Sequence, residues 1–209
     1  MARHKVEKAV DRLAEWWLLI GAESAAALLT PTDLAVRTYR ATARSQVPCE
    51  GLGTPVVATV SDRVRALDEE LSEHLVTPEQ LRAHDQRLIE VLAGEPGVAA
   101  REAREAAGRR LVISRVVAEV RSDRAADAVV SFADLMRFAV AVSEVDHARD
   151  NLRSRYAVVL VDEYQDTSVA QRLMLQNLFG PGFPLTAVGD PLQAIYGWRG
   201  GDAALFKEI

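Results

Sequence analysis

The chain has 209 residues, of which 49% are hydrophobic and 26% charged, and its formal net charge is −5 at pH 7. This length can bury the core of one or two domains, and the acidic balance excludes a surface that is basic throughout, although not a local nucleic-acid site. Cys49 is the only cysteine, which excludes an internal disulfide and a cysteine-based zinc site. The chain has neither a membrane-length apolar run nor a signal peptide, so we expect a cytoplasmic protein.

The N-terminal quarter predicts two helices and a loop. Apolar residues at helical spacing indicate a first helix over 6–20. The apolar run 25–29 fits either a short strand or more helix. A capping Thr followed by Pro predicts a helix start at 30–33, and the glycines and prolines of 48–55 predict a loop. The run 56–60 is a candidate short strand.

The middle of the chain is charged and strongly helical. A capping box with Pro at the first helical position predicts a helix from 77–80. Glycine and proline at 94–97 end it, and the Ala- and Arg-rich stretch 98–120 predicts the next helix. A capped amphipathic helix follows over 131–140, and 143–155 is expected to be a polar connection.

Charged side chains in this middle region are expected to lie on solvated helix faces. His84 and Asp85 stand beside other polar residues, and the four histidines have no metal-ligand spacing. Glutamates interrupt the arginine series over 101–110, which favours a salt-bridged helix surface over a DNA track.

The last quarter predicts a βαβ unit. The run 157–161 is apolar without alternation, which is typical of a parallel strand covered on both faces. A capping box at 168–171 begins a helix that 180–182 ends, and a second apolar strand follows over 185–188. Strand, helix and strand within about 30 residues indicate a parallel α/β sheet.

Polar residues leave both predicted strands at the edge where parallel sheets bind ligands. Asp162, Glu163 and Gln165 follow the first strand, and Asp190 and Gln193 follow the second. In a magnesium–nucleotide site, Asp162 would hold the metal through water and Glu163 would orient and deprotonate the attacking water. The alternative is a strand that ends in solvent, and for these two acidic residues alone this simpler interpretation is preferred.

Longer strings in the same region resemble motifs of the UvrD/Rep family of superfamily 1 DNA helicases. The run 159–168, VLVDEYQDTS, resembles the family's Walker B motif, and 188–201, VGDPLQAIYGWRGG, resembles its motif III. Upstream, 131–136, SFADLM, looks like the family's DFDDLL helix. The order and spacing of the three matches identify the chain as a member of this family.

The resemblance assigns roles at the ATP site. Asp162 and Glu163 match the magnesium ligand and the catalytic base, and Gln193 matches the motif III glutamine near the γ-phosphate. Gln165 and Asp190 are expected to contact the nucleotide from the same edge. The implied cofactors are ATP and Mg²⁺.

The resemblance also places a DNA contact in motif III. Trp198 matches an aromatic on which a single-stranded base stacks, and Tyr196 lines the same surface. Arg199 is a candidate phosphate, base or interdomain contact. The alternative for the two aromatic residues is ordinary core packing.

One motif of the family is absent from the 209 residues. No glycine is followed by lysine, so no G-x-x-x-x-G-K-[ST] phosphate loop is present. The segments 28–32 and 58–61 look faintly like motifs Ia and Ib, although a helix over the same residues is the alternative. We therefore expect an ATP-binding domain that begins late, stops before the second motor domain, does not unwind DNA alone and hydrolyses ATP negligibly.

The expected fold is α/β: a partial helicase ATP-binding domain over 1–209, with a helical insertion at 61–125 resembling subdomain 1B and a partial RecA-like parallel sheet within 126–209. The expected function is that of a fragment or truncated member of an ATP-dependent 3′–5′ DNA helicase in repair or recombination. Its partners would be single-stranded DNA and the rest of the helicase. The alternative is a non-catalytic remnant that binds DNA or a subunit of a helicase–nuclease.

Overall fold

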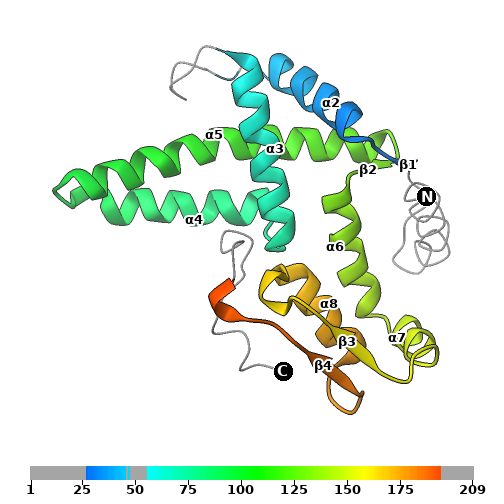
Figure 1. The fold of residues 1–209 in the computed structure, drawn as a ribbon. Coiled ribbons are helices and arrows are strands. Elements are labelled where there is room, and N and C mark those ends of the chain that lie inside the picture. The colour runs from blue at the N-terminus through cyan, green and yellow to red at the C-terminus, as the bar shows by residue number, and fades with distance from the viewer. Residues whose placement is uncertain (1–26, 46, 48–55, 194–209) are drawn as a thin grey trace. The chain divides into compact units, whose positions relative to one another are not determined.

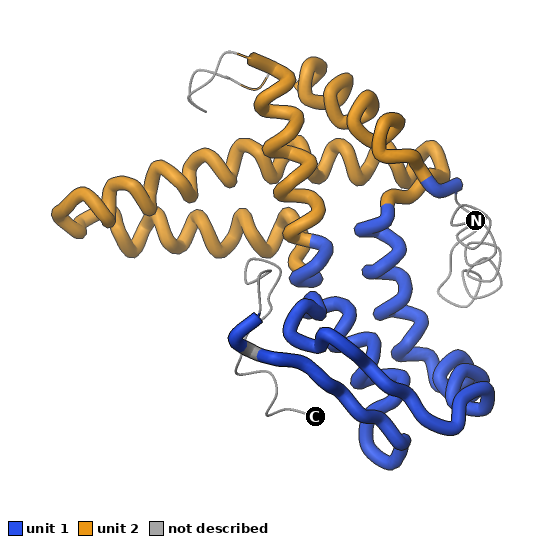
Figure 2. Tube along the Cα trace, viewed as in Figure 1, with its two compact units in different colours: residues 1–28, 72–75, 132–209 blue, residues 29–71, 76–131 orange. Residues whose placement is uncertain are grey.

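A computed structural model describes residues 27–45, 47 and 56–193 of the chain. The predicted helix over 6–20 and the predicted loop over 48–55 lie outside the described residues. The chain divides into two compact units, and Figure 2 colours them separately. Unit 1 comprises residues 1–28, 72–75 and 132–209, and unit 2 comprises 29–71 and 76–131.

Four long helices build the described part of unit 2. They are α2 (Pro31–Arg44), α3 (Val57–Glu73, whose last two residues belong to unit 1), α4 (Pro78–Val91) and α5 (Val98–Ala126). A 3₁₀ turn, η3 (Leu92–Gly94), follows α4, and α4 and α5 lie side by side (Figure 1). The predicted capping box is confirmed, because Gln80 N–H donates to Thr77 Oγ1 over 3.2 Å and Thr77 N–H donates to Gln80 Oε1 over 2.8 Å.

The predicted strand over 56–60 is wrong, because this segment opens α3. Val60 and Val64 stand one helical turn apart and are both fully buried. They pack in one hydrophobic cluster with Val116, Val117 and other residues of α5. The helical period over the longer window therefore prevails over the β propensity of a short valine-rich run.

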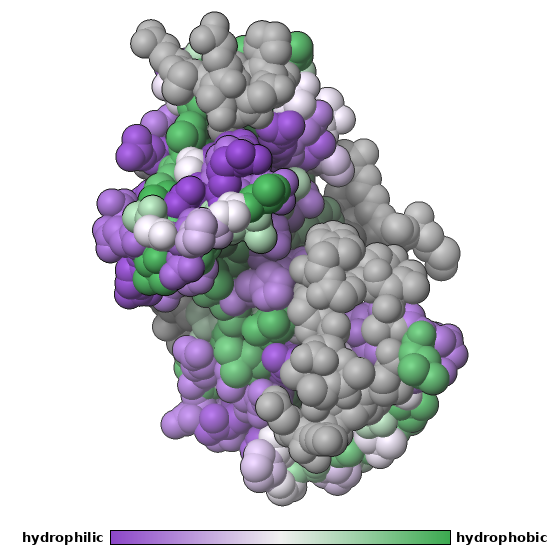
Figure 3. Space-filling view, turned by 90° about the vertical axis from the view of Figure 1, so that its left-hand side faces the viewer, coloured by the Kyte–Doolittle hydropathy of each residue, from purple (hydrophilic) through white to green (hydrophobic). Residues whose placement is uncertain are grey.

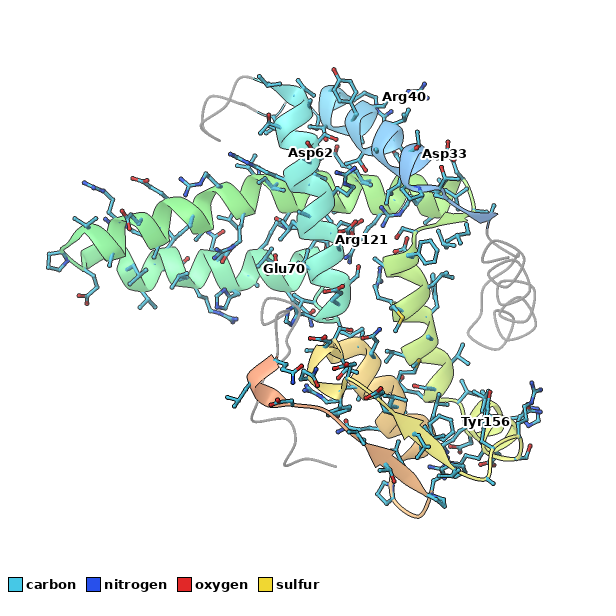
Figure 4. The ribbon with its side chains drawn as sticks, viewed as in Figure 1. Asp33, Arg40, Asp62, Glu70, Arg121 and Tyr156 are labelled. Carbon is cyan, nitrogen blue, oxygen red and sulfur yellow. The ribbon has the colours of Figure 1, made fainter. Side chains whose placement is uncertain are left out.

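Two buried carboxylates fix α5 to its neighbours in unit 2. Asp85 is fully buried and accepts two bonds from Arg110, over 2.9 Å from Nε and 2.6 Å from Nη2. Asp68 on α3 pairs with Arg121 over 2.6 Å and with Arg124 over 2.8 Å, and Figure 4 labels Arg121 on α5. The prediction that Asp85 faces solvent is thus wrong, because its partner lies 25 residues away on another helix.

Short strands and shorter helices build the described part of unit 1. They are α6 (Phe132–Ser143), α7 (Asp146–Arg153), β3 (Val159–Val161), η4 (Tyr164–Asp166), α8 (Val169–Phe179), β4 (Leu185–Ala187) and η5 (Pro191–Gln193). The polar connection predicted over 143–155 is wrong, because α7 interrupts it; Ala148 is fully buried and Leu152, one turn on, half-buried. Two further strands have two residues each: β1 (Ala27–Leu28) belongs to unit 1 and β2 (Val129–Val130) to unit 2. The strand β1 falls in the run 25–29, which fitted either a strand or a helix.

The predicted βαβ unit is confirmed. The capping box of Ser168 and Gln171 starts α8, and β3 pairs with β4 in parallel, with Leu160 opposite Thr186. The prediction that the strand over 157–161 is covered on both faces is wrong within the described residues, because Leu160 is 75% exposed. In the space-filling view, hydrophobic residues also reach the surface among hydrophilic ones (Figure 3). No helix among the described residues is long and apolar enough to cross a membrane.

Candidate functional site

The candidate site lies at the carboxyl ends of β3 and β4. Val188 N–H donates to the Val161 carbonyl over 2.8 Å, and Tyr164 N–H donates to the Val188 carbonyl over 3.0 Å. These backbone bonds continue the ladder past the last residue of each strand. The segments that carry the predicted site residues are therefore held against each other, as expected for parallel strands.

Asp162 and Glu163 both lie exposed at the end of β3. Glu163 N–H donates to Asp162 Oδ1 over 2.9 Å. Glu163 has φ 52° and ψ 41°, the left-handed region that a residue other than glycine seldom adopts. This conformation ends the strand and turns the backbone into η4. The side chains of Asp162 and Glu163 therefore do not point to opposite faces as they would along a continuing strand.

Gln165 connects the ends of the two strands. Its side chain is 4% exposed, and its Nε2 donates to Glu163 Oε2 over 2.6 Å. Its Oε1 accepts a bond from Asp190 N–H over 3.0 Å. One buried amide thus contacts the carboxylate after β3 and the backbone after β4.

Asp190 in turn holds η5, the turn that carries Gln193. Its carboxylate accepts bonds from Leu192 N–H and from Gln193 Nε2, both over 2.9 Å. These bonds favour the charged form, so the Leu192 amide first, and Gln193 second, lower the pKa of Asp190 below its ordinary value. Gln193 N–H also donates to the Asp190 carbonyl over 2.9 Å.

The described structure therefore joins four of the predicted site residues in one hydrogen-bonded series: Glu163, Gln165, Asp190 and Gln193. Asp162 stands beside this series and bonds the Glu163 backbone. The predicted DNA contacts Tyr196, Trp198 and Arg199 lie outside the described residues. The bridging role of Gln165 was not predicted, since the sequence shows its spacing from Glu163 but not its contact with Asp190.

The carboxylates suit a hydrated divalent ion better than a closed metal centre. Within the described part of the chain, no group of three or more His, Cys, Asp or Glu side chains could hold a metal ion. Mg²⁺ at nucleotide sites is held by one or two carboxylates, with water and phosphate oxygens completing its shell. The exposed carboxylate of Asp162 fits that chemistry.

Elsewhere, two arginines at a cavity of unit 2 pair with aspartates. A cavity of about 820 Å³ between α2 and the end of α5 is lined by Arg37 and Arg44 among others. Arg37 pairs with Asp127, and Arg44 pairs with Asp123. The lining of this cavity therefore mixes acidic and basic side chains, Asp33 and Arg40 among them.

Comparison with known proteins supplies the family. The model of the UvrD/REP helicase N-terminal domain matches residues 23–209. The chain belongs to the UvrD/REP helicase family. Within this family the joined series of Glu163, Gln165, Asp190 and Gln193 falls in the segments that resemble Walker B and motif III.

Curated relatives of this helicase family member include subunits of helicase–nucleases. The chain is 49% identical over 69 residues to the RecBCD enzyme subunit RecB of Mycobacterium tuberculosis (strain CDC 1551 / Oshkosh), covering 32% of the chain and 6% of the relative. It is 44% identical over 78 residues to the exonuclease/helicase subunit RexA of Lactococcus lactis subsp. cremoris (strain MG1363), with 37% and 6% covered. For RecB of Escherichia coli (strain K12) the identity is 29% over 166 residues, with 68% and 14% covered. The chain thus spans a small part of the length of these relatives.

Proposed function

We propose that this chain supplies the carboxylate side of the ATP site of a 3′–5′ DNA helicase or helicase–nuclease subunit. The observation that carries the proposal is the hydrogen-bonded series from Glu163 through Gln165 and Asp190 to Gln193 in a member of a helicase family. The relatives RecB and RexA are named as enzyme subunits, which favours a role beside partner subunits. The proposal includes a part in DNA repair or recombination.

The chemistry follows from the positions of the side chains. Asp162 would hold Mg²⁺ through water, and the ion would neutralise charge that develops on the phosphates. Glu163 orients the attacking water and accepts its proton. Gln193, in the turn after β4, would lie near the γ-phosphate.

The same proposal covers the fold and the DNA contact. Residues 126–209 form part of a RecA-like core, and 61–125 form an insertion of the subdomain 1B kind. Trp198 stacks on a base of single-stranded DNA, Tyr196 lines the same surface and Arg199 contacts DNA nearby. Such stacking contributes about 1–3 kcal/mol per base and tolerates any sequence. We place the protein in the cytoplasm.

The 209-residue polypeptide alone is proposed to hydrolyse ATP negligibly. No glycine in it is followed by lysine, so the loop whose backbone N–H groups and lysine cradle phosphates is not among these residues. The same observation favours a second candidate function, a non-catalytic module that binds DNA or a partner subunit.

A chimaera separates the two candidates. Residues 157–193 would replace the homologous segment of Mycobacterium tuberculosis RecB, and DNA-stimulated phosphate release would be measured with and without Glu163→Gln. The helicase proposal expects a chimaera that hydrolyses ATP and loses at least about 100-fold in kcat on this substitution, as expected for a general base. A folded chimaera without turnover would favour the non-catalytic module.

The isolated chain provides the second measurement. Fluorescence anisotropy with a labelled single-stranded oligonucleotide should show binding that weakens about 10-fold or more in Trp198→Ala, since one stacked base is lost. Trp16→Ala, which removes a tryptophan of the helix predicted over 6–20 and leaves the motif III segment unchanged, serves as the matched control.

A further inference from the structure

Gln165 uses both ends of its amide in the site. It is 4% exposed, whereas Glu163, to which it donates over 2.6 Å, is exposed. Its oxygen accepts Asp190 N–H over 3.0 Å. A buried amide satisfied in this way is costly to replace, because the loss of either partner leaves a polar group without a hydrogen bond.

The chemistry of the two contacts selects an amide. A donor is needed toward the Glu163 carboxylate and an acceptor toward the Asp190 backbone, and a primary amide offers both. Glutamate would keep the acceptor but would place a second carboxylate against Glu163. Asparagine would keep both groups on a side chain one methylene shorter, which cannot span the same two partners from an unchanged backbone.

The contacts restrict the group on which catalysis would depend. A solvent-exposed glutamate samples several rotamers, and the bond from Gln165 removes part of that freedom. On its other side, Gln165 holds the Asp190 backbone, and the Asp190 carboxylate holds Gln193 Nε2 over 2.9 Å. The ends of β3 and β4 are therefore linked through side chains as well as through the backbone ladder.

We infer that Gln165 is a positioning residue, in place of the nucleotide contact expected from the sequence: it fixes the Glu163 carboxylate relative to the turn that carries Gln193. The catalytic meaning of this arrangement rests on the proposed function of Glu163 and Gln193. The arrangement itself is a property of the nucleotide-free chain, and so it is tested without ATP or DNA.

Native-state hydrogen exchange, followed by NMR on the 209-residue chain, tests the link to Asp190. Gln165→Ala should raise the exchange rate of the Asp190 amide by on the order of tenfold, the effect of losing one hydrogen bond. The Tyr164 and Val188 amides, held by the backbone ladder, should change less than about twofold. Gln165→Glu keeps the acceptor and should restore protection of Asp190. An unchanged Asp190 amide, or equal loss of protection at Tyr164 and Val188, overturns the inference.

The side-chain resonances of Gln165 test the link to Glu163. Glu163→Ala alters an exposed residue and should shift the Gln165 Nε2 resonances and speed the exchange of their protons. Gln176→Ala, an exposed glutamine on α8, is the matched control and should leave them unchanged. Resonances insensitive to Glu163→Ala overturn the inference. If the chain passes both tests but the chimaera hydrolyses no ATP, the positioning geometry is supported and the proposed helicase function is not.

Discussion

Glu163 holds the left-handed backbone conformation at the position where the site requires a carboxylate. For a residue with a Cβ this conformation costs about 1–2 kcal/mol, and here φ is 52°. Glycine adopts it without that penalty. A glycine would therefore relieve the strain but would remove the proposed base.

We accordingly expect Glu163→Gly to be more stable than Glu163→Ala by about 1 kcal/mol, even though glycine makes the unfolded chain more flexible. Both variants lose the carboxylate and its bond with Gln165, so the difference between them isolates the backbone term. Urea unfolding measures it. Equal free energies of unfolding for the two variants would show that the left-handed conformation is not kept in solution.

Asp190 gives a pH-dependent prediction at the same scale. The bonds from Leu192 N–H and Gln193 Nε2 lower its pKa in the folded chain. A carboxylate with a lowered folded pKa stabilises the fold fully above its unfolded pKa, and this contribution is lost as the pH falls through the lower, folded value.

The Leu192 amide should thus lose its protection at a lower pH than the one at which a free aspartate titrates. NMR titration of the Asp190 carboxyl measures the pKa directly. Asp190→Asn, which has no charge to titrate, should remove this step in the protection of Leu192. A pKa of Asp190 at or above that of a free aspartate contradicts the described turn.

Among the elements, α4 and α5 depend on the buried pair of Asp85 and Arg110. Asp85 is fully buried and accepts two bonds from Arg110, and its Oδ1 also lies 3.3 Å from His84 Nδ1. Removing one partner of a buried ion pair leaves the other uncompensated. Arg110 is partly exposed, so water would recover part of the loss.

We expect Asp85→Ala to lower the free energy of unfolding by about 2–3 kcal/mol, measured by urea denaturation. Asp62→Ala removes an aspartate of α3 whose pair with Arg65, over 3.0 Å, is exposed, and it should cost less than about 0.5 kcal/mol. Equal effects of the two substitutions would mean that the Asp85 pair is solvated.

The elements predicted from sequence are those that local chemistry specifies. The capping boxes at Thr77 and Ser168 need only residues three positions apart, and both are present in the structure. The strand predicted over 56–60 is wrong because the helical period that buries Val60 and Val64 extends beyond the short window. Asp85 was misassigned because its partner is set by the packing of two helices, which no local pattern records.

At the scale of the whole molecule, the site was predicted for a topological reason. Parallel strands bring their carboxyl ends to one edge, so Glu163 and Asp190 could be placed together from sequence order alone. The amide bridge of Gln165 could not, because it depends on the burial and rotamer of one side chain. The predicted contacts of Trp198 with DNA stay predictions.

The two-stranded sheet of unit 1 carries a consequence for the behaviour of the chain in solution. Parallel strands are ordinarily covered on both faces, yet Leu160 is 75% exposed at the centre of β3, while Val159 and Val161 beside it are half-buried. An exposed apolar strand promotes association between chains.

We expect the 209-residue polypeptide to self-associate as its concentration rises, and Leu160→Lys to shift sedimentation velocity profiles toward the monomer. Because this side chain packs little, the free energy of unfolding should change by less than about 0.5 kcal/mol. Leu192→Lys, at an exposed leucine outside the strands, should leave association unchanged. A Leu160→Lys variant destabilised by about 2 kcal/mol or more would mean that this face of β3 is packed in solution, and association equal to that of the unaltered chain would mean that the strand does not drive it.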